Sequence, residues 1–122
     1  MRVFFVDDQG GSLASLAAGV AALEGFPGAS EVHARSVGSP AVSPVVVAAL
    51  DEIGLVLPPP VRTFSTNEIA PSDRVIAIGP QALGGVERHW EATLPPGDAP
   101  ALVQRAGTRI VRDGLARRLR QG

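Results

Sequence analysis

The clearest candidate for chemistry in this sequence is a short acidic, glycine-rich segment near its start. Four apolar residues, Val3–Val6, lead directly into Asp7-Asp8-Gln9-Gly10-Gly11. A continuous apolar run is typical of a central parallel strand, and the loop after such a strand is a common ligand-binding position. We therefore treat this loop as the candidate site; its residues are Asp7, Asp8, Gln9, Gly10, Gly11, Ser12 and Leu13.

Two adjacent carboxylates in such a loop are compatible with three kinds of chemistry. Either carboxylate could fold back and accept hydrogen bonds from the loop amides and the next helix N-terminus, which is a structural role. Asp7 and Asp8 could instead hold Mg²⁺, which prefers oxygen ligands. Asp7 could also act as a nucleophile that forms an aspartyl phosphate. The residue types leave these alternatives open, together with an unidentified small ligand.

Known acidic sites of the second and third kinds have further requirements. Response-regulator receivers, which hold Mg²⁺ on an acidic pair after the first strand, also need a phospho-accepting aspartate ending the third strand and a late lysine. Here the corresponding strand ends in Ile78-Gly79, and the chain has no lysine. The haloacid-dehalogenase pattern needs a second aspartate two positions after the nucleophile, where this chain has Gln9.

The overall composition excludes several other kinds of site. There is no cysteine, which excludes thiolate nucleophiles, disulfides, iron–sulfur clusters and cysteine-ligated zinc, and there are only two histidines. The 11 basic residues are all arginine and stand against 12 acidic ones, so the net charge is −1. Near-neutral charge argues against a general polyanion binder, and we expect no nucleic-acid partner.

Length and hydropathy predict one globular domain, residues 1–122. No apolar run approaches the roughly 20 residues needed to span a bilayer, so we expect no membrane partner. The apolar run at the start is also shorter than the roughly 7–15 residues of a signal-peptide core. The sequence therefore predicts a cytoplasmic protein.

Apolar runs alternate with helical periodicity along the chain. This alternation predicts an α/β domain with a parallel sheet and helices on both faces. Ser43-Pro44 predicts a helix start, with an N-cap and a proline at the first helical position. Strands are expected at 2–6, 31–37 and 73–78, helices from 12, 44 and 101, and short helical pieces near 66–70 and 81–89. The last helix is expected to place Leu102, Val103, Ala106, Ile110, Leu115 and Leu119 on or near one face.

Three segments resemble the low-molecular-weight tyrosine phosphatases and thioredoxin-coupled arsenate reductases. Ser36-Val37-Gly38-Ser39 is similar to the family's Ser-Ala-Gly-Thr turn after the second strand. Ser43-Pro44 through Leu50, Glu52 and Gly54 is similar to its N-P-x-A-x-x-x-L-x-E-x-G helix. Trp90 followed by Leu94-Pro95-Pro96-Gly97 is similar to the reductases' late Trp and Leu-Pro-Asp-Pro. The resemblance covers nearly the whole chain. It implies a flavodoxin-like or Rossmann-like three-layer sandwich of phosphotyrosine phosphatase I type, with a four-stranded parallel sheet in the order 2-1-3-4.

The catalytic residues of that family are absent from the matching positions. The family places Cys-x5-Arg after the first strand, where the cysteine attacks phosphorus or arsenic and the arginine clamps the oxyanion. Aligned on that strand, Asp7 stands at the cysteine and Leu13 at the arginine; the general-acid aspartate falls near Pro96, with Asp98 two residues later. Loop carboxylates also repel phosphate, by roughly 4 kcal/mol per unit-charge pair about 4 Å apart at an effective dielectric near 20.

The resemblance therefore implies a catalytically inactive relative that acts as a binding or regulatory module. It places Ser39, Trp90 and Asp98 at the rim of the pocket. We expect a protein partner or a small ligand, no cofactor, and a monomer or homodimer. The alternative is a metal-dependent enzyme, or a Mg²⁺-binding receiver-like module, that uses Asp7 and Asp8.

Overall fold

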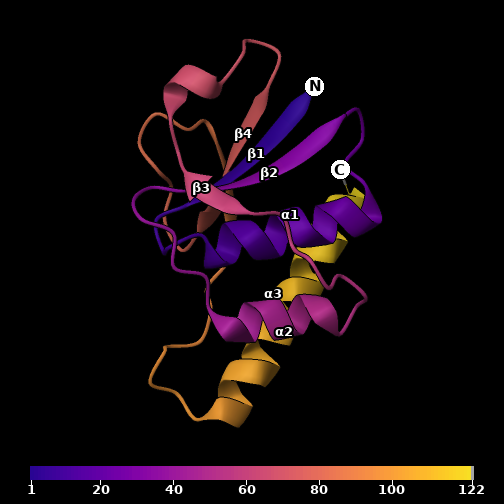
Figure 1. The fold of residues 1–122 in the computed structure, drawn as a ribbon, viewed down its shortest axis with the longest axis vertical. Coiled ribbons are helices and arrows are strands. Elements are labelled where there is room, and N and C mark those ends of the chain that lie inside the picture. The colour runs from indigo at the N-terminus through magenta and orange to yellow at the C-terminus, as the bar shows by residue number, and fades with distance from the viewer. Residues whose placement is uncertain (122) are drawn as a thin grey trace.

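The computed structural model describes residues 1–121 as an α/β fold with five strands and three α-helices (Figure 1). No helix among these residues is both long enough and apolar enough to cross a membrane. The elements are β1 (Arg2–Asp7), α1 (Ser12–Glu24), β2 (Glu31–Ser36), α2 (Pro44–Asp51), β3 (Val61–Thr63), the 3₁₀ turn η1 (Thr66–Glu68), β4 (Arg74–Gly79), β5 (Arg88–Glu91) and α3 (Ala101–Gln121).

The sheet is parallel throughout and has the order β3-β2-β1-β4-β5. If the short strand β3 is left out, the remaining order β2-β1-β4-β5 is the expected order 2-1-3-4, with β4 and β5 as the expected third and fourth strands. The expectation of four strands is wrong, because β3 adds a short fifth strand outside β2. The expected helical piece near 81–89 is also wrong: the residues after β4 form a loop, and Arg88–Glu91 is strand β5.

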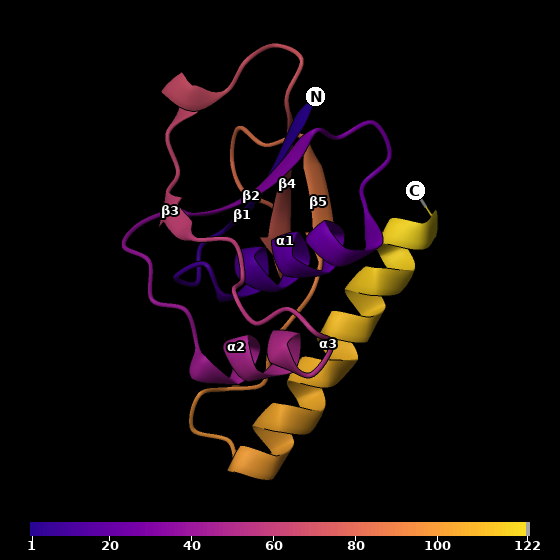
Figure 2. The same cartoon turned by 45° about the vertical axis from the view of Figure 1, so that its right-hand side comes forward.

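All three α-helices lie on one face of the sheet, so the expectation of helices on both faces is wrong (Figures 1 and 2). Helix α1 packs on β1, β2 and β4, while α2 and α3 pack on α1 and on each other. Right-handed crossovers explain this arrangement, because β1-α1-β2 and β2-α2-β3 move in the same direction across the sheet. The connection from β3 to β4 reverses that direction and passes over the other face, where this chain has η1 and loops.

The hydrophobic core lies between the sheet and the helices. Phe5 contributes its ring from β1 and contacts Trp90 of β5, with ring centroids 5.6 Å apart. Phe26, which follows α1, stacks near Trp90 at 6.4 Å. Helix α3 contributes fewer side chains to the core than its sequence suggests. Leu115 and Leu119 are buried, but Leu102 and Ile110 are 70% and 69% exposed.

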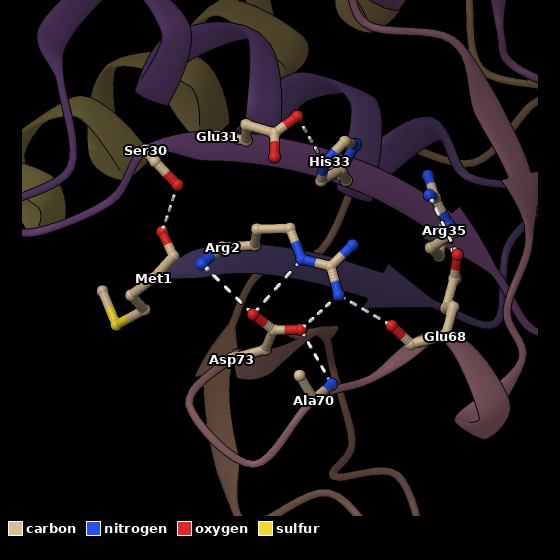
Figure 3. Close-up of polar contacts among 9 residues, drawn as sticks. All are labelled: Met1, Arg2, Ser30, Glu31, His33, Arg35, Glu68, Ala70 and Asp73. Atoms are coloured by element: carbon tan, nitrogen blue, oxygen red, sulfur yellow. Dashed lines mark hydrogen bonds and ion pairs between the residues drawn. The ribbon is translucent and has the colours of Figure 1, made fainter.

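The second face of the sheet is covered by ion pairs and not by helices (Figure 3). Phe4 is fully buried there. The His33 ring stacks on it at 5.0 Å, and the guanidinium carbons of Arg2 and Arg35 lie 5.1 and 5.2 Å from its centroid. Carboxylates from the segment between β3 and β4 complete the cover: Arg35 Nε donates to Glu68 at 2.7 Å, and Arg2 Nη2 donates to Asp73 at 2.6 Å. Paired guanidinium groups thus replace a third helical layer.

Helices α1 and α2 approach each other at Gly19. A Cβ built at this residue would lie 2.8 Å from both Leu50 Cδ atoms and 2.9 Å from Leu55 Cδ2. The absence of a side chain at Gly19 is therefore what allows α2 to pack this closely, and Leu50 is fully buried as a result.

We predict that Gly19→Ala lowers the free energy of unfolding although alanine favours helix. Overpacking at Leu50 costs about 1–3 kcal/mol, which outweighs a propensity gain of at most about 1 kcal/mol. The matched control is Gly114→Ala in α3, where an added Cβ meets only Arg117 Nη2 at 3.7 Å. That variant should be stabilised by about 0.5–1 kcal/mol. Urea unfolding of both variants checks the pair; an equal gain in both would contradict the close helix approach.

We also predict that the Arg2–Asp73 pair makes stability depend on acid pH. The Arg2 guanidinium, and then the Ala70 N–H, hold the pKa of Asp73 at about 2, below its ordinary 3.8. A depressed folded-state pKa contributes stability that is present above the ordinary pKa and is lost as the pH falls toward about 2. Asp73→Asn should therefore lower Tm at neutral pH, and the gap to wild type should shrink between about pH 5 and pH 2. The control is Asp98→Asn, which changes an exposed aspartate and should leave Tm equal to that of wild type at every pH. A Tm difference between Asp73→Asn and wild type that does not vary with pH would contradict the role of the Arg2–Asp73 pair.

Candidate functional site

The carboxylate of Asp7 lies inside the loop that follows β1. Its Oδ1 accepts hydrogen bonds from the backbone N–H groups of Gln9 at 3.0 Å and Gly11 at 2.7 Å. Its Oδ2 accepts from the N–H of Ala14 at 2.8 Å. The side chain is fully buried. This is the arrangement of the first alternative, in which a carboxylate folds back onto the loop amides.

The same carboxylate caps helix α1. The N-cap residue of α1 is Gly11, which has no side chain to accept from the first amides of the helix. Asp7 fills that role from the end of β1, because Ala14 is the third residue of α1. A negative charge at this position is also favoured by the positive end of the helix dipole. The site where a loop of this kind would hold an external oxyanion is therefore filled by a carboxylate of the chain itself.

Two glycines allow the loop to close this tightly. Gly10 and Gly11 have φ angles of 72° and 90°, in the left-handed region that residues other than glycine rarely adopt. A Cβ at Gly11 would lie 2.3 Å from Val61 Cγ1 of β3, and one at Gly10 would lie 2.9 Å from the carbonyl oxygen of Ala41. Ala41 N–H also donates to Gly10 O at 2.8 Å. The loop is thus held between β3 and the segment before α2.

The remaining loop residues do not converge on a ligand. Leu13, at the position of the family's arginine, is fully buried in the core between sheet and helices. Asp8 and Gln9 are exposed. Asp7 therefore points into the loop while Asp8 lies at its surface, so the two carboxylates do not present a shared pair of free oxygens to a cation. Among residues 1–121, no three His, Asp or Glu side chains are placed to hold a metal ion together.

A cavity of about 380 Å³ adjoins the loop at the carboxyl end of the sheet. Gln9 and Ser12 line it from the loop, and Ser12 Oγ accepts a hydrogen bond from the N–H of Ser43 at 2.9 Å. Gln104 and Thr108 line it from α3, and the segment Leu94–Gly97 closes it. No charged side chain is among the lining residues. The cavity therefore suits an uncharged ligand that makes hydrogen bonds to hydroxyl and amide groups.

The three residues expected at the pocket rim are not brought together. Ser39 and Asp98 are exposed and lie outside the lining of the cavity beside the loop. Trp90 lies in β5, is 9% exposed and contacts Phe5 and Phe26, so it belongs to the core and to a different cavity. Trp90 therefore packs in the interior and not at the rim of the cavity beside the loop.

Sequence reasoning missed the lining groups contributed by α2 and α3. The sequence pattern identifies Ser43 only as a helix cap, and Gln104 and Thr108 carry no local spacing signal. The sequence pattern identifies Ser36 only as part of a turn. Among the described residues, its Oγ is the buried side-chain polar atom that lacks a hydrogen-bond partner. The parallel register places Ser36 opposite Asp7, so it lies beside the closed loop.

Comparison with known proteins shows a similarity of fold without a detectable similarity of sequence. No protein-family model matches the chain, and no curated protein matches it significantly. A solved arsenate reductase in the phosphate binding state superposes with a TM-score of 0.69 and 18% identity, covering 98% of this chain and 94% of that chain. An arsenate reductase in the oxidized state gives a TM-score of 0.68 and 20% identity over the same shares.

Identities of this size establish the fold and not the chemistry. The match spans nearly the full length of both partners, so the whole architecture is shared and not one βαβ unit. The chain has no cysteine, and cysteine-dependent catalysis is therefore absent. This protein has the fold of the arsenate reductases, of the low-molecular-weight tyrosine phosphatase type, without the cysteine of their chemistry.

Proposed function

We propose that this protein is a catalytically inactive binding or regulatory module built on the arsenate reductase fold. The observation that carries the proposal is the set of three hydrogen bonds from loop and helix amides to Asp7. These amides are the groups that an oxyanion substrate would need. An incoming anion would have to displace a buried carboxylate whose hydrogen bonds are satisfied, and nothing in the loop stabilises that exchange.

The positions around Asp7 support the same proposal. An arginine clamp would have to occupy position 13, where Leu13 is part of the packed core. Asp8 at the loop surface adds a second negative charge that opposes anions. A partner at this edge of the sheet would therefore contact the neutral cavity beside the loop and not the loop amides.

The Mg²⁺-dependent alternative has less support. Both oxygens of Asp7 are engaged by amides, so binding a cation would remove at least one hydrogen bond from a buried group. A single exposed carboxylate such as Asp8 is a weak ligand for Mg²⁺, which usually takes one or two carboxylates together with substrate phosphates.

The first prediction of the proposal is that wild-type protein neither hydrolyses aryl phosphates nor binds phosphate, arsenate or sulfate at the loop of Asp7. The reason is that the amides of the loop are already hydrogen-bonded to Asp7. The measurements are an aryl-phosphate turnover assay and a thermal-shift panel that also includes Mg²⁺. A Tm increase with an oxyanion that persists in Arg88→Ala, a variant at the opposite end of the sheet, would contradict the closed loop. An increase with Mg²⁺ alone would favour the acidic-pair alternative.

The second prediction is that Asp7→Ser opens the loop to anions. Removing the carboxylate leaves buried amides without an acceptor, at about 1–3 kcal/mol for each unsatisfied group, so Tm should fall. Added phosphate or arsenate should then restore part of that loss, because it can take the vacated place at the amides and the helix N-terminus. Thermal unfolding with and without phosphate measures both effects.

Two further variants serve as controls for that experiment. Asp8→Ser removes the exposed carboxylate of the following residue. It should change little either in Tm or in the Tm shift that phosphate produces. Asp7→Asn keeps the shape but turns an NH₂ group toward amide donors, so it should be destabilised without phosphate rescue. Equal rescue of Asp7→Ser and Asp8→Ser would show that phosphate acts on the protein in general and not at the loop.

A further inference from the structure

A second cavity, of about 370 Å³, lies at the opposite end of the sheet from the closed loop. Arg74 and Arg88 open strands β4 and β5 and line it from the amino ends of these strands. Arg118 lines it from the last turn of α3, and Phe26 from the segment after α1. Figure 2 shows why these elements meet: α1 runs back from the loop to the amino edge of the sheet, and α3 ends beside it.

The three arginines of this cavity, Arg74, Arg88 and Arg118, which we call the arginine trio, have no carboxylate partner among residues 1–121. No acidic residue lines the cavity. Five of the other eight arginines form ion pairs among these residues: Arg2, Arg35, Arg109, Arg112 and Arg120. Three arginines from three separate elements, none of them in an ion pair among the described residues, thus line one concave site. Each is a planar donor fork that matches the oxygens of a phosphate or carboxylate.

The wall of the cavity beside the arginine trio is aromatic. Trp90 is held in the core by Phe5 and Phe26, with centroid distances of 5.6 and 6.4 Å. The guanidinium carbon of Arg118 lies 5.3 Å from the Trp90 ring centroid, so the charge and the apolar surface are adjacent. A ligand that fits must therefore carry both an anionic group and an apolar group.

We propose that this cavity binds a small organic phosphate of about mononucleotide size. The arginine trio takes the phosphate, and the surface of Phe26 and Trp90 takes the apolar or planar part. The volume of about 370 Å³ is at the small end of the range for ligand pockets and fits a molecule of that size. The site is separate from the loop of Asp7, so it can exist whether or not the proposed function of that loop is correct.

Trp90 gives a direct measurement, because it is the sole tryptophan of a chain that has no tyrosine. The experiment titrates the protein with adenosine monophosphate and follows tryptophan fluorescence under excitation that the nucleotide does not absorb. Adenosine and inorganic phosphate are titrated separately. We expect saturable quenching by adenosine monophosphate with a Kd on the order of 0.1–1 mM, and at least tenfold weaker binding of each part alone.

The variants compare two arginines that differ in their place and not in their charge. Arg88→Ala removes one exposed member of the trio. It should raise the Kd for adenosine monophosphate by about tenfold or more, the usual loss for a charge-assisted hydrogen bond. Arg117→Ala removes an exposed arginine of α3 that does not line the cavity, and should change the Kd less than about twofold. Calorimetric titration of both variants repeats the comparison without relying on fluorescence.

Three outcomes would overturn the proposal. One is the absence of quenching and heat with millimolar adenosine monophosphate and with phenyl phosphate. Another is equal weakening by Arg88→Ala and Arg117→Ala, which would mean attraction by the net charge of the surface. The third is equal affinity for adenosine, which would mean that the trio takes no part. None of these results depends on the response of Asp7→Ser to phosphate, so failure here is distinguishable from failure of the proposed function.

Discussion

Asp7 connects more of this structure than any other single residue. It is the last residue of β1. Its carboxylate accepts hydrogen bonds from two loop amides and caps α1, which has only a glycine at its N-cap. Its backbone oxygen also accepts from Val37 N–H at 2.8 Å, which fixes the exit of β2 beside it. A buried charge without such partners would be strongly destabilising. The loop around Asp7 must therefore keep its closed conformation, and the glycines that permit it are required for the same reason.

The two faces of the sheet are stabilised by different interactions. On the helical face, apolar groups such as Phe5 and Trp90 pack under α1 and α3. On the other face a buried ring, Phe4, is covered by the guanidinium groups of Arg2 and Arg35. Figure 3 shows how these groups pair with Asp73 and Glu68. Apolar packing changes little with acid pH, whereas these pairs weaken when their carboxylates are protonated. The helix-free face is therefore where we expect acid-induced opening to begin.

The sequence allowed most of the central elements to be predicted, but not the edges. Strands β1, β2 and β4 and the starts of α1 and α2 follow from apolar runs and caps, so they agree with expectation within about two residues. Strand β3 has three residues directly after three prolines, and β5 has one buried residue in R-H-W-E, so neither carries a pattern of useful length. The apolar periodicity of α3 is present in the sequence, but Leu102 and Ile110 are exposed in the structure. At the loop, residue types showed that a carboxylate could fill it; only the strand geometry decides that it is Asp7 and not Asp8.

The opposite ends of the sheet differ in charge in a way that helix dipoles do not fully explain. In α/β folds the helix N-termini at the carboxyl edge attract anions, and here that attraction at α1 is already satisfied by Asp7. At the amino edge the C-terminus of α3 carries Arg118 and Arg120, and positive charge there is expected for the helix alone. That argument does not extend to Arg74 and Arg88, because they open strands, where no comparable dipole exists. Two like charges beside Arg118 repel each other and Arg118. The organic phosphate that we propose at the amino edge would account for their position, and it would bind at the edge opposite to the one where α/β folds usually hold their ligands.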